Sequence, residues 1–262
     1  MPEIDVGATR LHYVLQGPED APAILMSNSL GTALEMWDPQ MPTLGERFRV
    51  LRYDSRGHGR SAVPPGDYTI DQLADDALGL MDALGIERAH FVGLSKGGMV
   101  GQALGARHGG RFISLTLCST ACHMAPKDLW DARVRTAREQ GMGALVDAVV
   151  ERWFTPAFRN SGDPAIRRVR EMILSTPAEG YAGCCAAIRD MDLRDVIGGI
   201  RVPTLIVVGA DDPATPPAKA EEIRDRIPDA ELEVIENAAH LLNIEQTVTF
   251  NHLLIDFINR TG

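Results

Sequence analysis

Short apolar runs alternate with amphipathic segments along much of the chain, and this alternation predicts strands separated by helices. The runs are rich in Val, Ile, Leu and Phe, which is typical of buried strands. They cover residues 11–16, 23–27, 49–53, 90–94, 113–118, 204–209 and 232–236. Residues 69–85 repeat their apolar side chains at intervals of three and four, which predicts an amphipathic helix. Because strands that alternate with helices form mostly parallel sheets flanked by helices, the predicted fold class is α/β.

The alternation stops after the run at 113–118 and resumes only at 204–209. Four consecutive helical patterns fill the gap, at residues 127–141, 142–154, 163–175 and 178–190. A helical stretch of this length inside an α/β pattern is most simply an inserted cap over the ends of the strands. We therefore expect a core made of residues 1–122 and 196–262, with a helical cap at 123–195.

The size and charge of the chain narrow the function classes. A chain of 262 residues suits one large domain with an insertion. The net charge of −10 disfavours nucleic acid and acidic membranes as partners. The amino-terminal segment lacks an apolar signal region and no apolar run is long enough to cross a bilayer, so we expect a cytoplasmic protein. The sequence does not decide between a monomer and a homo-oligomer.

The cysteines predict no cofactor. Cys118, Cys122, Cys184 and Cys185 are too few for a disulfide framework in a chain of this length, and no histidine or further cysteine follows them at metal-ligand spacing. Buried reduced thiols are the expected state.

The charges are divided unevenly between the two predicted parts. Residues 123–195 hold ten Arg and one Lys against eleven Asp and Glu, so the whole net charge of −10 lies on the core. A neutral, arginine-rich cap could therefore receive an anionic small molecule.

The sequence "GLSKG" at 93–97 places a serine between two glycines, after a predicted strand and before a predicted helix. This context distinguishes a nucleophile turn from a chance match. Such a turn holds the serine in a strained conformation, and the flanking glycines relieve the steric conflict. We therefore predict Ser95 as a nucleophile.

A serine hydroxyl needs a histidine that accepts its proton and a carboxylate that orients the histidine. On this fold the expected chain order is Ser95, then an acid, then a histidine. Asp211 and Asp212 follow the strand at 204–209, and His240 follows the strand at 232–236. We choose Asp212 because it directly precedes a proline that would turn it toward His240. His58, between two glycines, is assigned to a turn.

Acyl transfer also needs hydrogen-bond donors for the developing oxyanion. One donor would be the backbone N–H of Lys96, at the start of the helix after the nucleophile. The other would come from the loop "SNSLGT" at 27–32, where Leu30 takes the donor position.

At this point a resemblance becomes specific. The chain resembles the α/β-hydrolases and, within them, the 3-oxoadipate enol-lactonases (β-ketoadipate enol-lactone hydrolases). The similar stretches are "SNSLGTALEMW", "RVLRYDSRGHGRS", "GLSKGG", "CSTA", "RWFTPAF", "EGYAGCCAAIRDMDLR" and "NAAHLLNIE". The resemblance implies an α/β-hydrolase fold with an inserted cap, a catalytic triad of Ser95, Asp212 and His240, and oxyanion donors at Leu30 and Lys96. It also implies hydrolysis of a carboxylated ester or lactone in aromatic catabolism, without a metal or organic cofactor.

Lys96 departs from the pattern of these enzymes, which usually carry Met, Leu or Gln after the nucleophile. Two explanations are open: the ammonium group pairs with an acid of the cap, or it helps to hold a substrate carboxylate.

For the substrate carboxylate we choose Arg133 in the cap, with Trp130 and Trp153 as apolar walls. Each cap arginine taken alone is better explained as a member of a surface ion pair. Three other functions use the same residues: a carboxylesterase or lactonase acting on a different ester, a C–C hydrolase or haloperoxidase-like enzyme, and a ligand-sensing α/β-hydrolase. Haloalkane dehalogenases are excluded because they require an aspartate at the position of Ser95.

Overall fold

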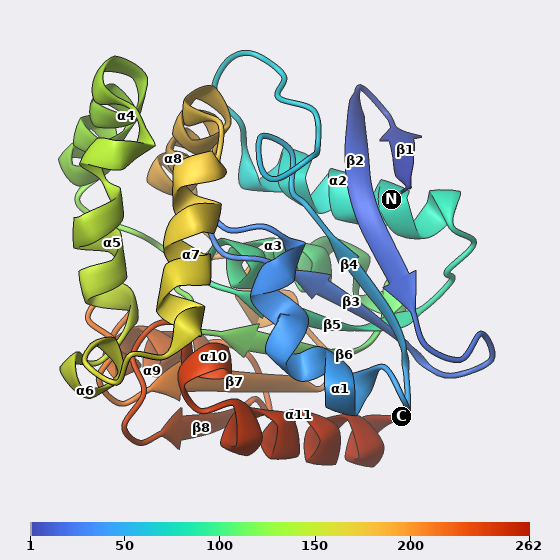
Figure 1. Cartoon of the computed structure of the whole chain (residues 1–262). Helices are drawn as coiled ribbons and strands as arrows, with labels where there is room; N and C mark the ends of the chain where they lie inside the picture. Colours follow the sequence, from blue (N-terminus) through green and yellow to red (C-terminus); the bar gives the residue numbers. More distant parts are fainter. Residues whose placement is uncertain (1) are drawn as a thin grey trace.

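The computed structural model describes residues 2–262, in which eight strands form one twisted sheet with helices on both sides (Figure 1). The strands are β1 (Glu3–Val6), β2 (Thr9–Gln16), β3 (Ala23–Ser27), β4 (Arg49–Tyr53), β5 (Ala89–Leu94), β6 (Phe112–Cys118), β7 (Thr204–Gly209) and β8 (Glu231–Ile235). Their order is β1-β2-β4-β3-β5-β6-β7-β8. β2 pairs antiparallel with β1 and β4, and the other pairs are parallel. The predicted mostly parallel α/β sheet is confirmed.

β1 is the strand that the apolar pattern missed. Its sequence, Glu-Ile-Asp-Val, alternates polar and apolar residues, but it has only four residues, of which only Val6 is buried, and it contains no continuous apolar run. A tight turn containing Gly7, at φ 52°, connects it to β2, and the left-handed backbone there suits glycine.

The helices are α1 (Met41–Leu44), α2 (Ile70–Ala83), α3 (Lys96–His108), α4 (Lys127–Gln140), α5 (Val146–Trp153), α6 (Pro156–Arg159), α7 (Pro164–Ser175), α8 (Ala178–Asp190), α9 (Pro217–Arg224), α10 (Leu242–Glu245) and α11 (Thr247–Thr261), with 3₁₀ turns η1 (Leu34–Gln40), η2 (Gly109–Arg111), η3 (Met142–Ala144) and η4 (Ile197–Gly199). The five helices predicted by range, α2, α4, α5, α7 and α8, begin and end within four residues of their predicted bounds. A capping box fixes the start of α2, because the Thr69 hydroxyl accepts from the N–H of Gln72 while the Gln72 side chain accepts from the N–H of Thr69.

Helices α4 to α8 lie between β6 and β7 in the chain and gather at the carboxyl ends of the parallel strands (Figure 1). α4 packs against α8, and α5 packs against α7. The two ends of the insertion meet, because His123 pairs with Asp192 in an isolated bridge and the N–H of Leu193 donates to the carbonyl of Cys122, at 2.9 Å. We propose residues 123–195 as a cap on this basis.

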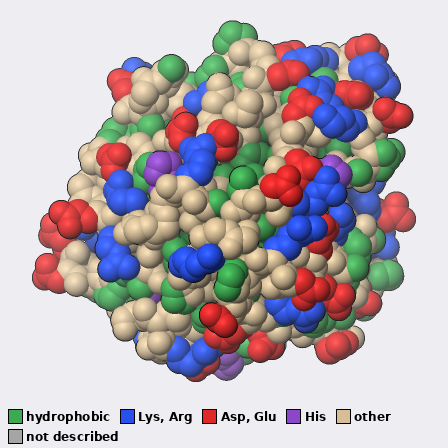
Figure 2. All heavy atoms as spheres, turned by 180° about the vertical axis from the view of Figure 1, so that it is seen from behind, with side chains coloured by type: hydrophobic (Ala, Val, Ile, Leu, Met, Phe, Trp, Pro, Cys, Tyr) green, Lys and Arg blue, Asp and Glu red, His purple; other side chains and the backbone are tan. Residues whose placement is uncertain are grey.

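The surface carries charged side chains of both signs (Figure 2), and the cysteines lie in the interior. Figure 2 shows acidic and basic side chains interspersed over the face opposite to that of Figure 1. All four cysteines are free and buried. Among residues 2–262, no helix is both long and apolar enough to span a membrane.

Candidate active site

Ser95 lies in a sharp turn between β5 and α3, with φ 57° and ψ −112°. A positive φ at a residue other than glycine is strained and persists only where the surroundings enforce it. A Cβ atom at Gly93 would lie 2.3 Å from the carbonyl oxygen of Gly97, and one at Gly97 would lie 2.1 Å from that of Ser27. Both contacts involve backbone atoms, so the two glycines of the motif are sterically required.

Neighbouring strand ends hold this turn in place. The N–H of Ser95 donates to the carbonyl of Cys118, and the hydroxyl of Thr120 donates to the carbonyl of Ser95, each at 2.8 Å. In the register between β3 and β5, Ser27 lies opposite Gly93. The loop 27–32 therefore begins beside the serine turn.

His240 and Asp212 meet at the same edge of the sheet. Asp212 Oδ2 lies 2.8 Å from His240 Nδ1 and accepts from the Thr215 hydroxyl, also at 2.8 Å. Asp212 Oδ1 accepts from the N–H groups of Ala214 and Thr215, at 2.8 and 3.0 Å. The carboxylate only accepts hydrogen bonds, so the proton of a neutral His240 lies on Nδ1 and Nε2 is left as a base. Asp211 is exposed, whereas Asp212 is buried.

The hydrogen bonds keep Asp212 ionised. Burial alone would raise the pKa of this carboxyl, but the facing His240 and the hydrogen bonds from His240 and Thr215 lower it below its ordinary value. A permanently charged Asp212 can stabilise the positive charge that His240 gains when it accepts a proton.

Ser95 and His240 border one cavity of about 470 Å³ between the sheet edge and the cap. Its other lining residues are Ser29, Leu30, Met99, Met124, Ala125, Leu129, Trp130, Arg133, Leu145, Ala148, Val149, Arg152, Trp153, Tyr181, Ile188, Pro213, Ala214 and Thr215. The ring of Trp153 stacks on that of His240, with centroids 5.9 Å apart. Within residues 2–262 no hydrogen bond joins Ser95 Oγ to His240, so proton transfer between them remains part of the proposal below.

A larger recess, of about 880 Å³, lies on the surface between α7 and η1. Its charged lining groups include Glu35, Asp38, Arg60 and Arg168, and it contains none of the predicted catalytic residues. The smaller cavity is therefore the better candidate site, because it brings a serine, a histidine and the cap together.

Two arginines of the cap line the cavity and form no ion pair with a carboxylate of residues 2–262. Arg133 lies on the lining with its guanidinium 4.7 Å from the ring centroid of Trp130. Arg152 lines the same cavity, and its pKa is lowered by burial and by the charge of Arg133. Six other cap arginines form ion pairs with Asp or Glu, namely Arg138, Arg159, Arg167, Arg170, Arg189 and Arg194. An anion in the cavity would relieve the mutual repulsion of the two unpaired guanidinium groups.

The two predicted oxyanion donors lie on the loop 27–32 and at the start of α3. Leu30 lines the cavity, and Lys96 begins α3, where the first N–H groups have no partner inside the helix. The N–H of Gly31 donates to Nε2 of His58, at 2.9 Å, which anchors the loop from behind. His58 Nδ1 therefore carries the proton and faces the carbonyl of Arg56, 3.2 Å away. His58 does lie in the predicted glycine turn, but its buried ring also holds this loop.

We expect His58 to make the protein less stable in mild acid. Burial, together with the charge of Lys96, holds the pKa of His58 well below 6.5. Below pH 6.5 the unfolded chain therefore binds a proton at this position that the folded protein rejects, and stability falls with pH. At pH 5.5 the loss from His58 is at most about 1.4 kcal/mol, the limit for a histidine whose unfolded pKa is about 6.5 and that stays neutral in the folded protein.

Urea unfolding at pH 7.5, 6.5 and 5.5 measures this effect. His58→Gln should reduce the pH dependence of the unfolding free energy by up to one proton, whereas the matched change His252→Gln, at an exposed position of α11, should leave it unchanged. Equal pH slopes for wild type and His58→Gln would show that His58 does not stay neutral in the folded protein.

Sequence reasoning missed two residues of this site. Asp212 forms an Asx turn with the N–H of Ala214, two residues on, and Thr215 follows directly, so the local sequence carries a detectable signal for Thr215. Nothing in the sequence distinguishes Arg152 from the other cap arginines, because only the packing of the cap brings it beside Arg133. The structure places Ser95, Leu30, Arg133, Trp130, Trp153 and His240 around one cavity, with Asp212 behind His240.

The parallel sheet and the serine turn after β5 define a protein of the α/β-hydrolase class. The family model for the alpha/beta hydrolase fold matches residues 22–247, so the chain belongs to this family and is a hydrolase by relationship.

Individual relatives are more specific. The chain is 39% identical to 3-oxoadipate enol-lactonase 2 of Acinetobacter baylyi, over 92% of this chain and 90% of that protein. The crystal structure of the enol-lactonase from Burkholderia xenovorans LB400 is 45% identical, with a TM-score of 0.96, and the match covers 98% of this chain and 100% of that one. A Caulobacter sp. (strain K31) protein that carries the name of a carbamate hydrolase, RutD, is 32% identical over 95% of both chains.

Proposed function

We propose that this protein is a serine hydrolase that opens 3-oxoadipate enol-lactone to 3-oxoadipate in the catabolism of aromatic compounds. One observation carries the proposal: the cavity combines a serine and a histidine with two arginines that have no acidic partner in the described part of the chain. Such a cavity suits an ester that also bears a carboxylate. The relatives named enol-lactonases, which match nearly the full chain, support the same substrate.

In the proposed first half-reaction, His240 Nε2 takes the proton of Ser95 as Oγ attacks the lactone carbonyl carbon. The N–H groups of Leu30 and Lys96 donate to the oxyanion of the tetrahedral intermediate. When the intermediate collapses, the ring C–O bond breaks, and the enolate oxygen that leaves takes the proton from His240. The resulting enol tautomerises to a ketone while the acyl group stays on Ser95.

In the second half-reaction, His240 removes a proton from water, which attacks the acyl carbon. The new tetrahedral intermediate expels Ser95 Oγ, which recovers its proton from His240, and 3-oxoadipate leaves. Asp212 keeps His240 in the required tautomer during both halves. Neither half requires a metal or an organic cofactor.

The cap would supply the selectivity. Arg133 and Arg152 would hold the substrate carboxylate, and Trp130 and Trp153 would cover the apolar part of the ring. The same observation disfavours a neutral ester or carbamate as the main substrate, because such a molecule would leave both guanidinium groups without a counter-charge. The turnover rate distinguishes an enzyme from a ligand-sensing receptor, since a receptor would release product too slowly for a catabolic step.

Removing either arginine charge tests the substrate class. Arg133→Leu and Arg152→Leu should each raise KM for the carboxylated lactone about 10- to 100-fold, because a hydrogen bond to a charged group contributes about 1.5–3 kcal/mol. For a neutral aryl ester, KM should change less than about threefold, because no carboxylate is lost. Steady-state kinetics with both substrates give the comparison.

Arg135→Leu is the matched control. Arg135 lies in α4, is exposed and does not line the cavity, so neither KM value should change. If Arg133→Leu and Arg152→Leu affect both substrates equally, these arginines do not bind the carboxylate. If the wild-type protein hydrolyses the neutral ester but not the lactone, the proposed substrate is wrong.

A further inference from the structure

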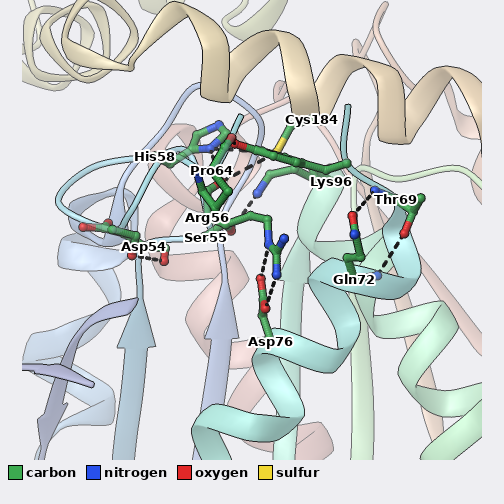
Figure 3. A network of polar contacts seen from close by, with 12 residues as sticks. Asp54, Ser55, Arg56, His58, Pro64, Thr69, Gln72, Asp76, Lys96 and Cys184 are labelled. Carbon is green, nitrogen blue, oxygen red and sulfur yellow. Dashed lines mark hydrogen bonds and ion pairs between the residues drawn. The ribbon is translucent and has the colours of Figure 1, made fainter. Parts of the chain in front are cut away.

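The side chain of Lys96 turns away from the cavity and into the protein. Its exposed fraction is zero, and Nζ donates to the hydroxyl of Ser55, at 2.7 Å (Figure 3). Within residues 2–262 it has no carboxylate within 4.0 Å and is not part of the cavity lining, so it neither pairs with a cap acid nor reaches a substrate carboxylate. Both explanations drawn from the sequence are wrong for this conformation.

Ser55 connects Lys96 to the loop 27–32, which carries Leu30. The hydroxyl of Ser55 donates to Asn28 Oδ1, at 3.2 Å. Asn28 Nδ2 then donates to the carbonyl oxygens of Ser29 and Thr32. Three side chains therefore link the first residue of α3 to both sides of Leu30.

The protonated form of Lys96 fixes the direction of the hydrogen bonds among Lys96, Ser55 and Asn28. An ammonium group can only donate, so Ser55 Oγ accepts from it and directs its single proton toward Asn28. The Asn28 amide is then oriented with its oxygen toward Ser55 and its nitrogen toward the two carbonyls. Burial lowers the pKa of Lys96, and the nearby Asp76 and Asp54 partly oppose this shift. The side chains of Lys96, Ser55 and Asn28 are all buried, and a hydrogen-bonded network inside a protein restricts the conformations of its members.

We propose that the Lys96 side chain is a positioning residue for the oxyanion hole, acting through Ser55 and Asn28 on the N–H of Leu30. Lys96 thus has two roles: its backbone N–H is one predicted oxyanion donor, and its side chain positions the other. This proposal rests on the serine-hydrolase chemistry proposed above but not on the lactone substrate. A displaced donor stabilises the transition state less strongly but leaves substrate binding unchanged.

Hydrolysis of p-nitrophenyl acetate, a neutral ester, tests this role whatever the natural substrate of the protein is. Lys96→Met, which fills a similar volume, should lower kcat about 10- to 100-fold and change KM less than about twofold, because removing an oxyanion donor outright costs about 10²- to 10³-fold. A boronic acid that adds to Ser95 should lose affinity by a similar factor, since its tetrahedral adduct needs the same donors.

Two further variants separate positioning from folding. Ser55→Ala breaks the same chain at its centre, so it should also lower kcat, and the Lys96→Met/Ser55→Ala double variant should fall little further than the worse single variant. Gln102→Met is the matched control. Gln102 is a buried polar residue of the same helix, and it donates to the carbonyls of Gly98 and Ala121 rather than to Lys96, Ser55 or Asn28. Its kcat should stay near wild type.

Titration of active serines with a fluorophosphonate gives the fraction of folded enzyme, and kcat is expressed per titrated site. A wild-type kcat per site and unchanged boronic acid affinity in Lys96→Met or Ser55→Ala would overturn the proposal. Multiplicative losses in the double variant would also overturn it, because the two residues would then act independently. A wild-type protein that hydrolyses the ester but not the lactone refutes the substrate while leaving this test intact.

Discussion

Replacing Ser95 by alanine is expected to lower kcat about 10⁴- to 10⁶-fold for the lactone and for a neutral ester alike. The expected loss is that large because the serine is the covalent nucleophile and the other groups of a triad contribute little without it. Binding should persist, since alanine removes only the hydroxyl. The strained backbone at φ 57° is borne equally well by serine and alanine, so the thermal unfolding midpoint should change little.

Ser119→Ala is a close control for this variant. Ser119 follows the neighbouring strand β6, is buried, and also has a positive φ, 42°. It does not line the cavity, so its loss should leave kcat unchanged. Mass spectrometry after fluorophosphonate treatment should show one adduct on the wild type and on Ser119→Ala, and none on Ser95→Ala. Residual activity above about 1% in Ser95→Ala would mean that another group attacks the ester.

The sequence could predict the sheet and the serine turn because both depend on local patterns. Seven apolar runs mark seven of the eight strands, and β1 escaped because its four residues contain no continuous apolar run. The glycines of the serine turn are set by close backbone contacts, so they too are visible in the sequence. The parallel arrangement then places Ser95 and His240 at one edge, since each follows the carboxyl end of its strand.

The direction of side chains inside the fold could not be predicted in this way. Lys96 follows the nucleophile, and the sequence does not tell whether its long side chain faces the substrate or the interior. That choice depends on Ser55, which is 41 residues away in sequence and comes near only after the sheet forms. In the same way, Arg152 becomes a candidate binding residue only because the cap brings it and Arg133 to one cavity.

The second large effect is expected for Asp212→Asn, which should lower kcat about 10⁴-fold with little change in KM. The backbone dictates how the asparagine amide would lie. Position Oδ1 accepts from the N–H groups of Ala214 and Thr215, so the amide oxygen must occupy it. The amide nitrogen then faces His240 Nδ1 and donates to it. His240 is thereby forced to carry its own proton on Nε2, where it can no longer accept the proton of Ser95.

Asp211→Asn is the control that isolates this effect, because it makes the same chemical change one residue earlier at an exposed position. Its kcat should remain within about twofold of wild type, and the measurement is steady-state hydrolysis of the neutral ester by the two variants. If Asp212→Asn keeps more than a tenth of the wild-type kcat, Asp212 does not set the tautomer of His240. Thr215, whose hydroxyl lies 3.3 Å from His240 Nδ1, is then the residue that the structure offers for that role. If Asp211→Asn is the variant that loses activity, the choice of Asp212 over its neighbour is wrong.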